Sequence, residues 1–191
     1  MTDPLRQALR QTCQLVRKKL PPDFQRHASN RICAQIRQIE AYRYAKRIAL
    51  YHAIHGEVNV HSIWRSAPLQ GKYCYFPVLN DNLTLAFLPA TPLTPFSKNR
   101  FGIQEPTVGR EHALDPQKLD LLLMPLVLFD LDGTRVGMGE GYYDRTLAES
   151  PRPMLMGVAY EFQRQSWLMS APWDIPLDVI ITEKANYWRK P

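Results

Sequence analysis

The sequence predicts an α/β fold, because candidate strands alternate with candidate helices and the strand candidates are almost continuously apolar. The most apolar run is LDLLLMPLVLF (119–129). Uninterrupted apolar runs are typical of strands buried on both faces, as in parallel sheets that helices cover on either side. The 191 residues are 45% hydrophobic and 22% charged, which suits a chain with a substantial core. We therefore expect residues 1–191 to form a single three-layer, Rossmann-like domain with a largely parallel central sheet flanked by helices.

The N-terminal part of the chain is predicted to begin with two helices. Asp3 suits an N-cap and Pro4 the first helical position, so the first helix should run to about Leu20. Pro21 and Pro22 then end it. Spacing and apolar runs predict the elements that follow. They are a helix over 22–42, a strand over 47–53, a turn at Gly56, a short helix over 60–67, and a strand pair over 72–78 and 83–88.

The C-terminal part begins with a proline-rich stretch over 89–106, which is predicted to be a long loop. A connection of that length inside a compact domain is usually functional or mobile. Apolar runs and turn residues then predict further strands and helices. These are a strand over 119–129, a helix over 142–148, a strand over 154–160, a short helix over 161–169 and a last strand over 177–183.

The chain carries a net charge of +6, from 24 basic and 18 acidic side chains. This excess suggests an anionic partner, such as nucleic acid, a phosphorylated cofactor or a polycarboxylate. Arg6 and Arg10 lie four residues apart in the first helix, so they share one face and could hold one polyphosphate together. A merely solvated basic face is the alternative. A nucleic-acid-binding module that uses this helix also stays open, and steeply salt-dependent binding would reveal it.

The cysteines and the N-terminus point to a cytoplasmic protein. Cys13, Cys33 and Cys74 are far apart and form no CxxC pair, and the charged N-terminus lacks the apolar segment of a secretory signal. No apolar run reaches the roughly 18 residues that a membrane span needs. We expect reduced thiols, no membrane association and a monomer.

The segment RVGMGEGYYDR (135–145) places glycine at 137, 139 and 141 in a chain with only nine glycines. Glycine clusters allow positive φ or the close approach of a ligand to the backbone. The segment lies between a predicted buried strand and a helix, where backbone N–H groups can bind phosphate. It is neither a GxGxxG fingerprint nor a GK[ST] phosphate loop. A tight turn is the alternative, but two tyrosines and Asp144 directly afterwards favour a site for a planar ring and a phosphate-bound metal.

The segment FDLDGT (129–134) has a competing interpretation. It resembles the nucleophile motif of haloacid-dehalogenase-type phosphatases, in which Asp130 would attack phosphate and Asp132 would act as acid and base. That motif opens its domain in those enzymes, whereas here it lies late in the chain. A β-turn with Asp132 and Gly133 at its tip is the interpretation that we favour.

Four residues at the end of the first predicted strand and just after it look at first like a metal cluster: His52, His55, Glu57 and His61. On a strand, His52 and His55 would point to opposite faces, which argues against a shared zinc site. His55 to Glu57 nevertheless follow a strand end, where α/β sheets bind ligands. Asp174, before the last strand, could be a cap or a second metal ligand with Asp144.

Together these segments resemble the 5-formyltetrahydrofolate cyclo-ligase family, also called methenyltetrahydrofolate synthetases. The family pattern is an apolar strand followed by Pro-x-x-x-Phe-Asp-x-x-Gly-x-Arg-Leu-Gly-x-Gly-x-Gly-Tyr-Tyr-Asp. This chain matches it in register, which makes Asp132 a variable position of a longer motif. The matching residues are Pro125, Phe129, Asp130, Gly133, Arg135, Gly137, Gly139, Gly141, Tyr142, Tyr143 and Asp144.

The resemblance extends over most of the chain. Arg6, Leu9 and Arg10 resemble the family's Lys/Arg-x-x-Leu-Arg opening, which contacts ATP phosphates. His52 and Gly56-Glu57 resemble its substrate contacts, and Asp174 falls at its second magnesium ligand. Phe101-Gly102-Ile103 and Glu105-Pro106 match its FGIxEP segment. The chain departs from the family pattern where Val136 replaces leucine, where Glu140 stands at a position that is usually glycine, and where His52 is more polar than expected.

The resemblance implies a C–N bond-forming ligase that uses ATP and Mg²⁺ to cyclise 5-formyltetrahydrofolate, a folate that can carry a polyglutamate tail, to 5,10-methenyltetrahydrofolate. Its catalytic residues would be Arg135, Tyr142 and Tyr143. ATP would contact Arg6, Arg10, Arg135, Gly137, Met138, Gly139, Glu140, Gly141, Tyr142 and Tyr143. The substrate would contact His52, Glu57, Phe101, Met138, Gly139, Glu140, Gly141 and Tyr142, and Asp144 and Asp174 would hold Mg²⁺.

Overall fold

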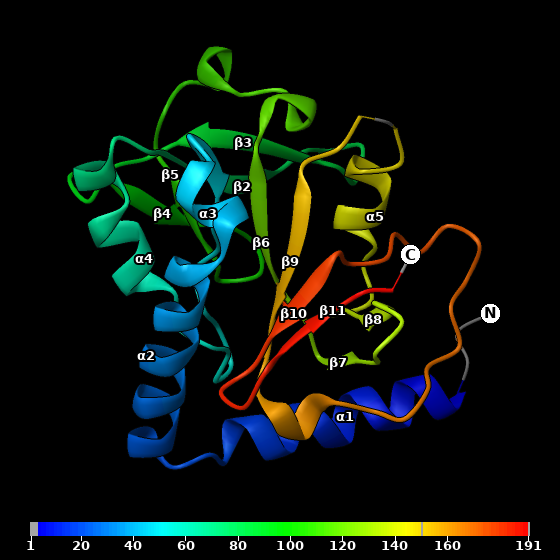
Figure 1. Ribbon diagram of the computed structural model, residues 1–191. Helices are drawn as coiled ribbons and strands as arrows, with labels where there is room; N and C mark the ends of the chain where they lie inside the picture. The colour runs from blue at the N-terminus through cyan, green and yellow to red at the C-terminus, as the bar shows by residue number, and fades with distance from the viewer. Residues whose placement is uncertain (1–3, 150, 191) are drawn as a thin grey trace.

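The computed structural model describes residues 4–149 and 151–190, and its centre is a mixed β-sheet (Figure 1). Within those residues the sheet has seven strands in the order β11-β10-β9-β6-β1-β2-β3. Their bounds are β1 (Arg47–Ala49), β2 (Tyr73–Leu79), β3 (Leu85–Pro89), β6 (Leu121–Pro125), β9 (Met154–Val158), β10 (Val179–Ile181) and β11 (Asn186–Trp188). The predicted α/β class is confirmed.

The sheet is parallel in its interior and antiparallel at both edges. β10, β9, β6, β1 and β2 run parallel, whereas β3 pairs antiparallel with β2 and β11 pairs antiparallel with β10. From β1 the chain first adds β2 on one side, and then returns to add β6, β9 and β10 on the other. The strand order therefore reverses between β1 and β6, and such a switch point opens a crevice beyond the carboxyl ends of the two strands.

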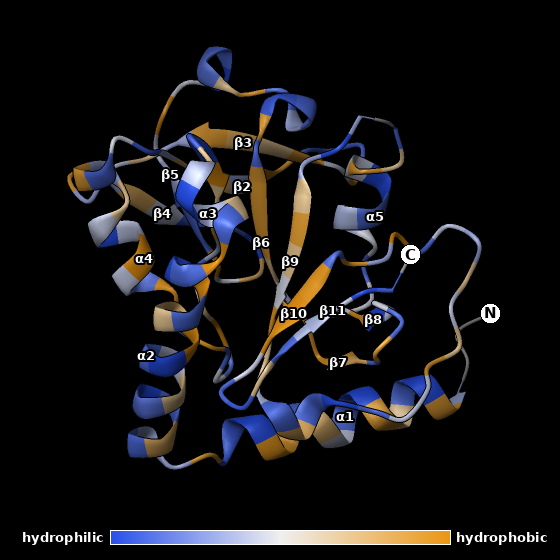
Figure 2. Ribbon diagram, in the orientation of Figure 1, coloured by the Kyte–Doolittle hydropathy of each residue, from blue (hydrophilic) through white to orange (hydrophobic). Residues whose placement is uncertain are grey.

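Helices cover both faces of the sheet. Alternate residues of each strand point to opposite faces, so the apolar side chains on both sides are buried under helices. Leu121 and Leu123 of β6 pack in a core cluster with residues of α2, α3 and α4, whereas Leu122 and Met124 pack toward α5. These helices are α2 (Pro22–Gln38), α3 (Glu40–Tyr44), α4 (His61–Ser66) and α5 (Tyr142–Thr146). In Figure 2, β6 and β10 are hydrophobic along their lengths, while α1 and α2 carry many hydrophilic residues.

Helix α1 (Pro4–Lys18) lies across the carboxyl ends of the central strands, at the bottom of Figure 1. Its Cys13 packs with Val127, Leu128 and Val136 in a third apolar cluster. Two short antiparallel pairs complete the fold: β4 (Phe96–Lys98) with β5 (Gln104–Pro106), and β7 (Leu128–Phe129) with β8 (Arg135–Val136). None of the helices described is long and apolar enough to cross a membrane.

The structure differs from several of the elements that were predicted from the sequence. The run 119–129 is not one strand, because β6 ends at Pro125 and the chain turns into the separate pair β7–β8. The predicted helix 22–42 breaks at Ile39, which has extended backbone. The proline-rich stretch contains β4 and β5, and residues 161–169 hold only a 3₁₀ turn over Glu161–Gln163. The predicted N-cap, Asp3, lies outside the described residues.

Gly157 in β9 is the place where the sheet core leaves no room for a side chain. A Cβ there would lie 2.5 Å from Leu177 Cδ1 and 2.9 Å from Leu126 Cδ2, both in buried side chains. We predict that Gly157→Ala lowers the free energy of unfolding by about 1–3 kcal/mol through overpacking. Urea denaturation would measure it. Gly137→Ala, where a Cβ meets nothing within 4 Å, is the matched control and should change stability much less. Equal effects would contradict this packing account.

Candidate functional site

The expected site residues gather at the switch point between β1 and β6. The segment after β1 carries His52 and Glu57, and the segment after β6 leads through β7 and β8 to the glycine loop, which we define as residues 137–141. Helix α1 closes the same edge with its arginines. Ligands of open α/β sheets bind at this place, so the topology by itself selects these segments.

The glycine loop has the backbone of an anion-binding turn. Gly139 has φ +113° and Gly141, the N-cap of α5, has φ +67°, values that a residue with a side chain rarely adopts. Across the described residues, the backbone N–H groups of 138–141 donate no hydrogen bond. Successive free N–H groups in such conformations form concave sites for anions. The loop can therefore donate hydrogen bonds to the oxygens of a phosphoryl group.

Helix α1 places Arg10 directly against this loop. Arg10 Nε donates to the Gly137 carbonyl at 2.9 Å, and the guanidinium passes over Gly139. Gln14, one turn further, donates to the Met138 sulfur at 3.1 Å. Burial and the neighbouring Arg6 lower the pKa of Arg10. Arg6 and Arg10 thus share one helix face, as their spacing predicts.

Two aspartates and two arginines form a connected network beside the loop. Arg135 Nη2 donates to Asp144 Oδ1 at 2.7 Å, and the same oxygen accepts the Ile175 backbone N–H at 3.1 Å. Arg6 Nη2 donates to Asp174 Oδ2 at 3.0 Å and to the Arg135 carbonyl at 3.2 Å. Arg135 also donates to the Ile175 carbonyl and is nearly buried. The two carboxylates expected to hold metal are therefore brought together, each paired with an arginine.

This donor set fits Mg²⁺ that is held jointly with phosphates. Within the described residues no group of three or more His, Cys, Asp and Glu side chains is arranged to hold a metal ion. Mg²⁺ at phosphate sites commonly takes one or two carboxylates and fills its other positions with water and phosphate oxygens. Asp144 and Asp174 provide such a pair of oxygen ligands, in which Arg135 and Arg6 now offset the negative charge.

Tyr142 begins α5 and is held from two sides by cations. Its hydroxyl accepts a hydrogen bond of 2.6 Å from Arg100 Nη2, and Arg145 lies over its ring at 5.6 Å. Phe101 meets the same ring edge to face, with 6.5 Å between centroids. Arg100 and Phe101 stand at the tip of the hairpin β4–β5, which therefore reaches over to the glycine loop. Glu140 is exposed, and its carbonyl accepts from Arg145.

Glu57 is buried beside Arg17 and Tyr143. Arg17 Nη2 lies 3.3 Å from Glu57 Oε1, and Glu57 Oε2 accepts the Ile54 backbone N–H at 3.1 Å. Burial raises the pKa of Glu57 to about 7, although the Arg17 charge and the Ile54 hydrogen bond oppose this rise. Burial and the Glu57 charge raise the pKa of Tyr143 far above its usual value, while Arg135 acts the other way. Tyr143 is thus influenced by the charges of both Glu57 and Arg135.

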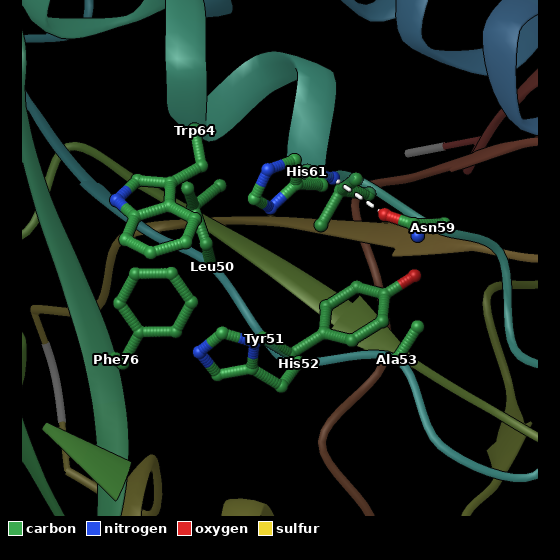
Figure 3. Close-up of a pocket in the computed structure, with 9 residues that line it drawn as sticks. Leu50, Tyr51, His52, Ala53, Asn59, His61, Trp64 and Phe76 are labelled. Atoms are coloured by element: carbon green, nitrogen blue, oxygen red, sulfur yellow. Dashed lines mark hydrogen bonds between the residues drawn. The ribbon is translucent and has the colours of Figure 1, made fainter. Parts of the chain in front are cut away.

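His52 lies in an aromatic cluster that borders a small cavity (Figure 3). Its ring stacks on Phe76 at 4.7 Å and meets Phe96 and Trp64 edge to face. The cavity has a volume of about 110 Å³. His52 Nε2 is buried, and no hydrogen-bond partner for it occurs among the described residues. Burial, with His61 nearby, lowers the pKa of His52 and so favours a neutral ring. Its contacts are with this cluster rather than with the glycine loop.

Asp130 has a structural role that argues against the phosphatase interpretation. Its Oδ1 accepts the backbone N–H groups of Asp132 and Thr134 at 3.0 Å each, and its Oδ2 accepts the Leu168 N–H at 2.9 Å. The residue is only 1% exposed. A carboxylate that is buried and saturated by the backbone cannot approach a substrate phosphate, so FDLDGT is the turn between β7 and β8.

No functional role for Arg17 or Arg100 was predicted from the sequence. Arg17 is seven residues after Arg10, which places it two helical turns along the same face, and this spacing could have indicated it. Its burial depends on Glu57 and Leu126, which are far away in the chain. Arg100 lies beside Phe101 in a stretch predicted as loop, and nothing in the local sequence indicates that it reaches Tyr142.

The chain is similar to proteins of one family over nearly its whole length. A model of the 5-formyltetrahydrofolate cyclo-ligase family matches residues 3–183. A Haemophilus influenzae protein named 5-formyltetrahydrofolate cyclo-ligase is 36% identical over 92% of this chain and 97% of its own length. The Escherichia coli K12 protein of the same name is 32% identical over 87% of this chain and 93% of its own length.

Solved structures agree with these sequence relatives. The Aquifex aeolicus 5,10-methenyltetrahydrofolate synthetase superposes with a TM-score of 0.86 at 31% identity, covering 98% of this chain and 94% of that one. The Mycoplasma pneumoniae 5,10-methenyltetrahydrofolate synthetase gives a TM-score of 0.75 at 27% identity, covering 93% of this chain and 98% of that one.

The raised pKa of Glu57 predicts a pH-dependent stability. Between pH 4.5 and about 7 the folded protein binds the Glu57 proton more tightly than the unfolded chain does, so this group's contribution is lost as pH rises through that window. A shift of this size corresponds to about 3 kcal/mol. Glu57→Gln lacks this loss, so its stability relative to wild type should increase between pH 5 and 8. Urea denaturation across that range measures it, with the exposed Glu149→Gln as control. Parallel curves for wild type and Glu57→Gln would refute the assignment.

Proposed function

Because the chain belongs to the 5-formyltetrahydrofolate cyclo-ligase family, which makes it a ligase, we propose the following reaction for it. The protein converts 5-formyltetrahydrofolate to 5,10-methenyltetrahydrofolate, using ATP with Mg²⁺ and releasing ADP and phosphate. One observation carries this proposal beyond the family. The free N–H groups of the glycine loop lie at the switch point, with Arg10 against the loop and the buried Glu57 on the segment that follows β1.

The chemistry explains why such a site needs ATP. The formyl oxygen of an amide is a poor leaving group. Attack of this oxygen on the γ-phosphorus, with ADP leaving, converts it to a phosphate ester. N10 then attacks the formyl carbon and loses its proton, and the oxygen departs within inorganic phosphate. No protein nucleophile is required, so the residues act by positioning and by neutralising charge.

The arginines and the glycine loop hold the polyphosphate in this proposal. Arg10 lies against the loop, and Arg6 and Arg135 supply further positive charge beside it. The backbone N–H groups of Met138, Gly139, Glu140 and Gly141 donate hydrogen bonds to the oxygens of the transferred phosphoryl group. Asp144 and Asp174 would hold Mg²⁺, which would supply positive charge to offset that of the phosphates. Arg6 and Arg135 keep both carboxylates in place for it.

The folate lies between the glycine loop and the residues that follow β1. Glu57 accepts hydrogen bonds from N–H groups of the pterin ring, and Tyr143 lies beside it. Tyr142 and Phe101 offer aromatic surface where the hairpin β4–β5 meets the loop. His52 contributes to the wall of the aromatic cluster, where it replaces the apolar residue usual in the family.

Near-ultraviolet absorbance tests this function directly. Purified protein with 5-formyltetrahydrofolate, Mg²⁺ and ATP should generate the methenyl chromophore, and omission of ATP should abolish the signal. A flat trace from folded protein would reject the proposed reaction. A salt-dependent complex with nucleic acid, without turnover, would support the alternative of a nucleic-acid-binding module.

The metal role of Asp144 gives a second prediction. Asp144→Asn keeps an oxygen that can accept from the buried Arg135, so the fold should persist, but it removes a charged Mg²⁺ ligand. We expect kcat/KM to fall about 100-fold or more, with a higher Mg²⁺ requirement. Asp132→Asn, in an exposed turn of the same motif, is the control and should turn over normally. Loss of activity in Asp132→Asn alone would instead support the phosphatase chemistry.

A further inference from the structure

Arg17 is an arginine that is almost completely enclosed at the crevice, with 1% of its surface exposed. All three nitrogens of its guanidinium group donate hydrogen bonds. Nε donates to the His55 carbonyl at 3.1 Å, Nη1 to the Leu126 carbonyl at 3.0 Å, and Nη2 to Glu57 Oε1 at 3.3 Å. The guanidinium group is planar and its N–H donors point in fixed directions, so these three hydrogen bonds hold the acceptor groups in defined positions around it.

The position of Arg17 links the two sides of the switch point. Glu57 and His55 follow β1, whereas Leu126 follows β6, so one side chain from α1 connects both segments. The backbone takes part as well, since a Cβ on Gly56 would lie 2.6 Å from the Arg17 carbonyl oxygen. Helix α1 and the turn that carries Glu57 are therefore interlocked.

The charge of Arg17 matters because the other groups around Glu57 are neutral. Three tyrosines come near this carboxylate: Tyr51 after β1, Tyr143 from α5 and Tyr160 after β9. Burial raises the pKa of each of them, so they stay uncharged near neutral pH. Arg17 is the cation that opposes the effect of burial on Glu57. Without it, burial would favour the protonated carboxyl.

We propose that Arg17 is a positioning residue of the reaction: it favours the ionised form of Glu57 and orients this carboxylate toward the pterin ring of the substrate. This inference rests on the proposed function. An ionised carboxylate can accept two N–H donors of the ring at once, whereas a protonated one loses an acceptor site and gains a donor. Arg17 acts through Glu57 and does not itself touch the substrate.

The test compares Arg17→Met, which removes the charge, with Arg17→Lys, which keeps the charge but loses the planar fork. Both changes are made in the wild-type chain and in the Glu57→Gln chain. The double variant Arg17→Met with Glu57→Gln leaves no buried charge without a partner, so it protects against loss of folding. Two readouts are used: ¹³C NMR titration of the Glu57 carboxyl, and kcat/KM for 5-formyltetrahydrofolate from pH 5.5 to 9 at saturating ATP.

We expect Arg17→Met to raise the pKa of Glu57 and to move the acid limb of kcat/KM to higher pH by about one unit or more. At pH 7 a rise of one unit lowers kcat/KM by about 5-fold, because the ionised fraction of Glu57 falls from about one half to about one tenth. Activity should largely recover near pH 9. Arg17→Lys should keep the limb near its wild-type position with a lower plateau. In the Glu57→Gln chain, Arg17→Met should not shift the acid limb of the kcat/KM profile, because no carboxyl group titrates at position 57.

Other results would overturn the inference. If Arg17→Met lowers kcat/KM equally at every pH, Arg17 only supports the fold. If Arg17→Met does not fold, Arg17→Lys alone decides: a plateau of kcat/KM equal to that of wild type would contradict the orienting role. A shift of the Glu57 titration in NMR without a shift of the kinetic limb rejects this inference while the proposed function stands. Absence of turnover in the wild-type protein rejects the proposed function, and the role of Arg17 with it.

Discussion

The contact of one face of α1 with the carboxyl edge of the sheet is the interaction on which the site depends. Arg6, Arg10 and Arg17 are spaced by four and seven residues, so they project from the same side of the helix. They contact Asp174, the Gly137 carbonyl and Glu57, which belong to three segments distant in sequence. Without this helix the glycine loop and the turn after β1 would have no common support.

Much of this support consists of buried or half-buried charge, which is a costly way to stabilise a fold. A buried ion pair loses hydration that its attraction recovers only in part, and apolar replacements of such pairs are often neutral or stabilising. Arg17 with Glu57 and Arg135 with Asp144 are therefore better explained by chemistry than by stability. Both pairs lie where the proposed reaction needs charges of defined sign and direction. The apolar clusters on the two faces of the sheet provide the stability that these pairs do not.

The fold class and the glycine loop were accessible from local sequence, whereas the charge pairs were not. Continuous apolar runs predicted the parallel interior of the sheet, and RVGMGEGYYDR predicted a turn with positive φ before a helix. The run 119–129 was wrongly predicted as one strand, because periodicity cannot show that a chain leaves one sheet and enters another. The burial of Arg17 depends on Leu126, 109 residues away, and the pairing of Asp174 depends on Arg6. The assigned roles of the site residues remain predictions.

Transfer of the formyl oxygen to phosphate is the most direct test of the claim that both substrates meet at the glycine loop. The measurement is mass spectrometry of the phosphate released from 5-formyltetrahydrofolate that carries ¹⁸O in its formyl group. If the γ-phosphoryl group passes to the formyl oxygen within this site, the phosphate carries the label. Unlabelled phosphate, with the label in water, would contradict the account, because ATP would then be hydrolysed separately from ring closure.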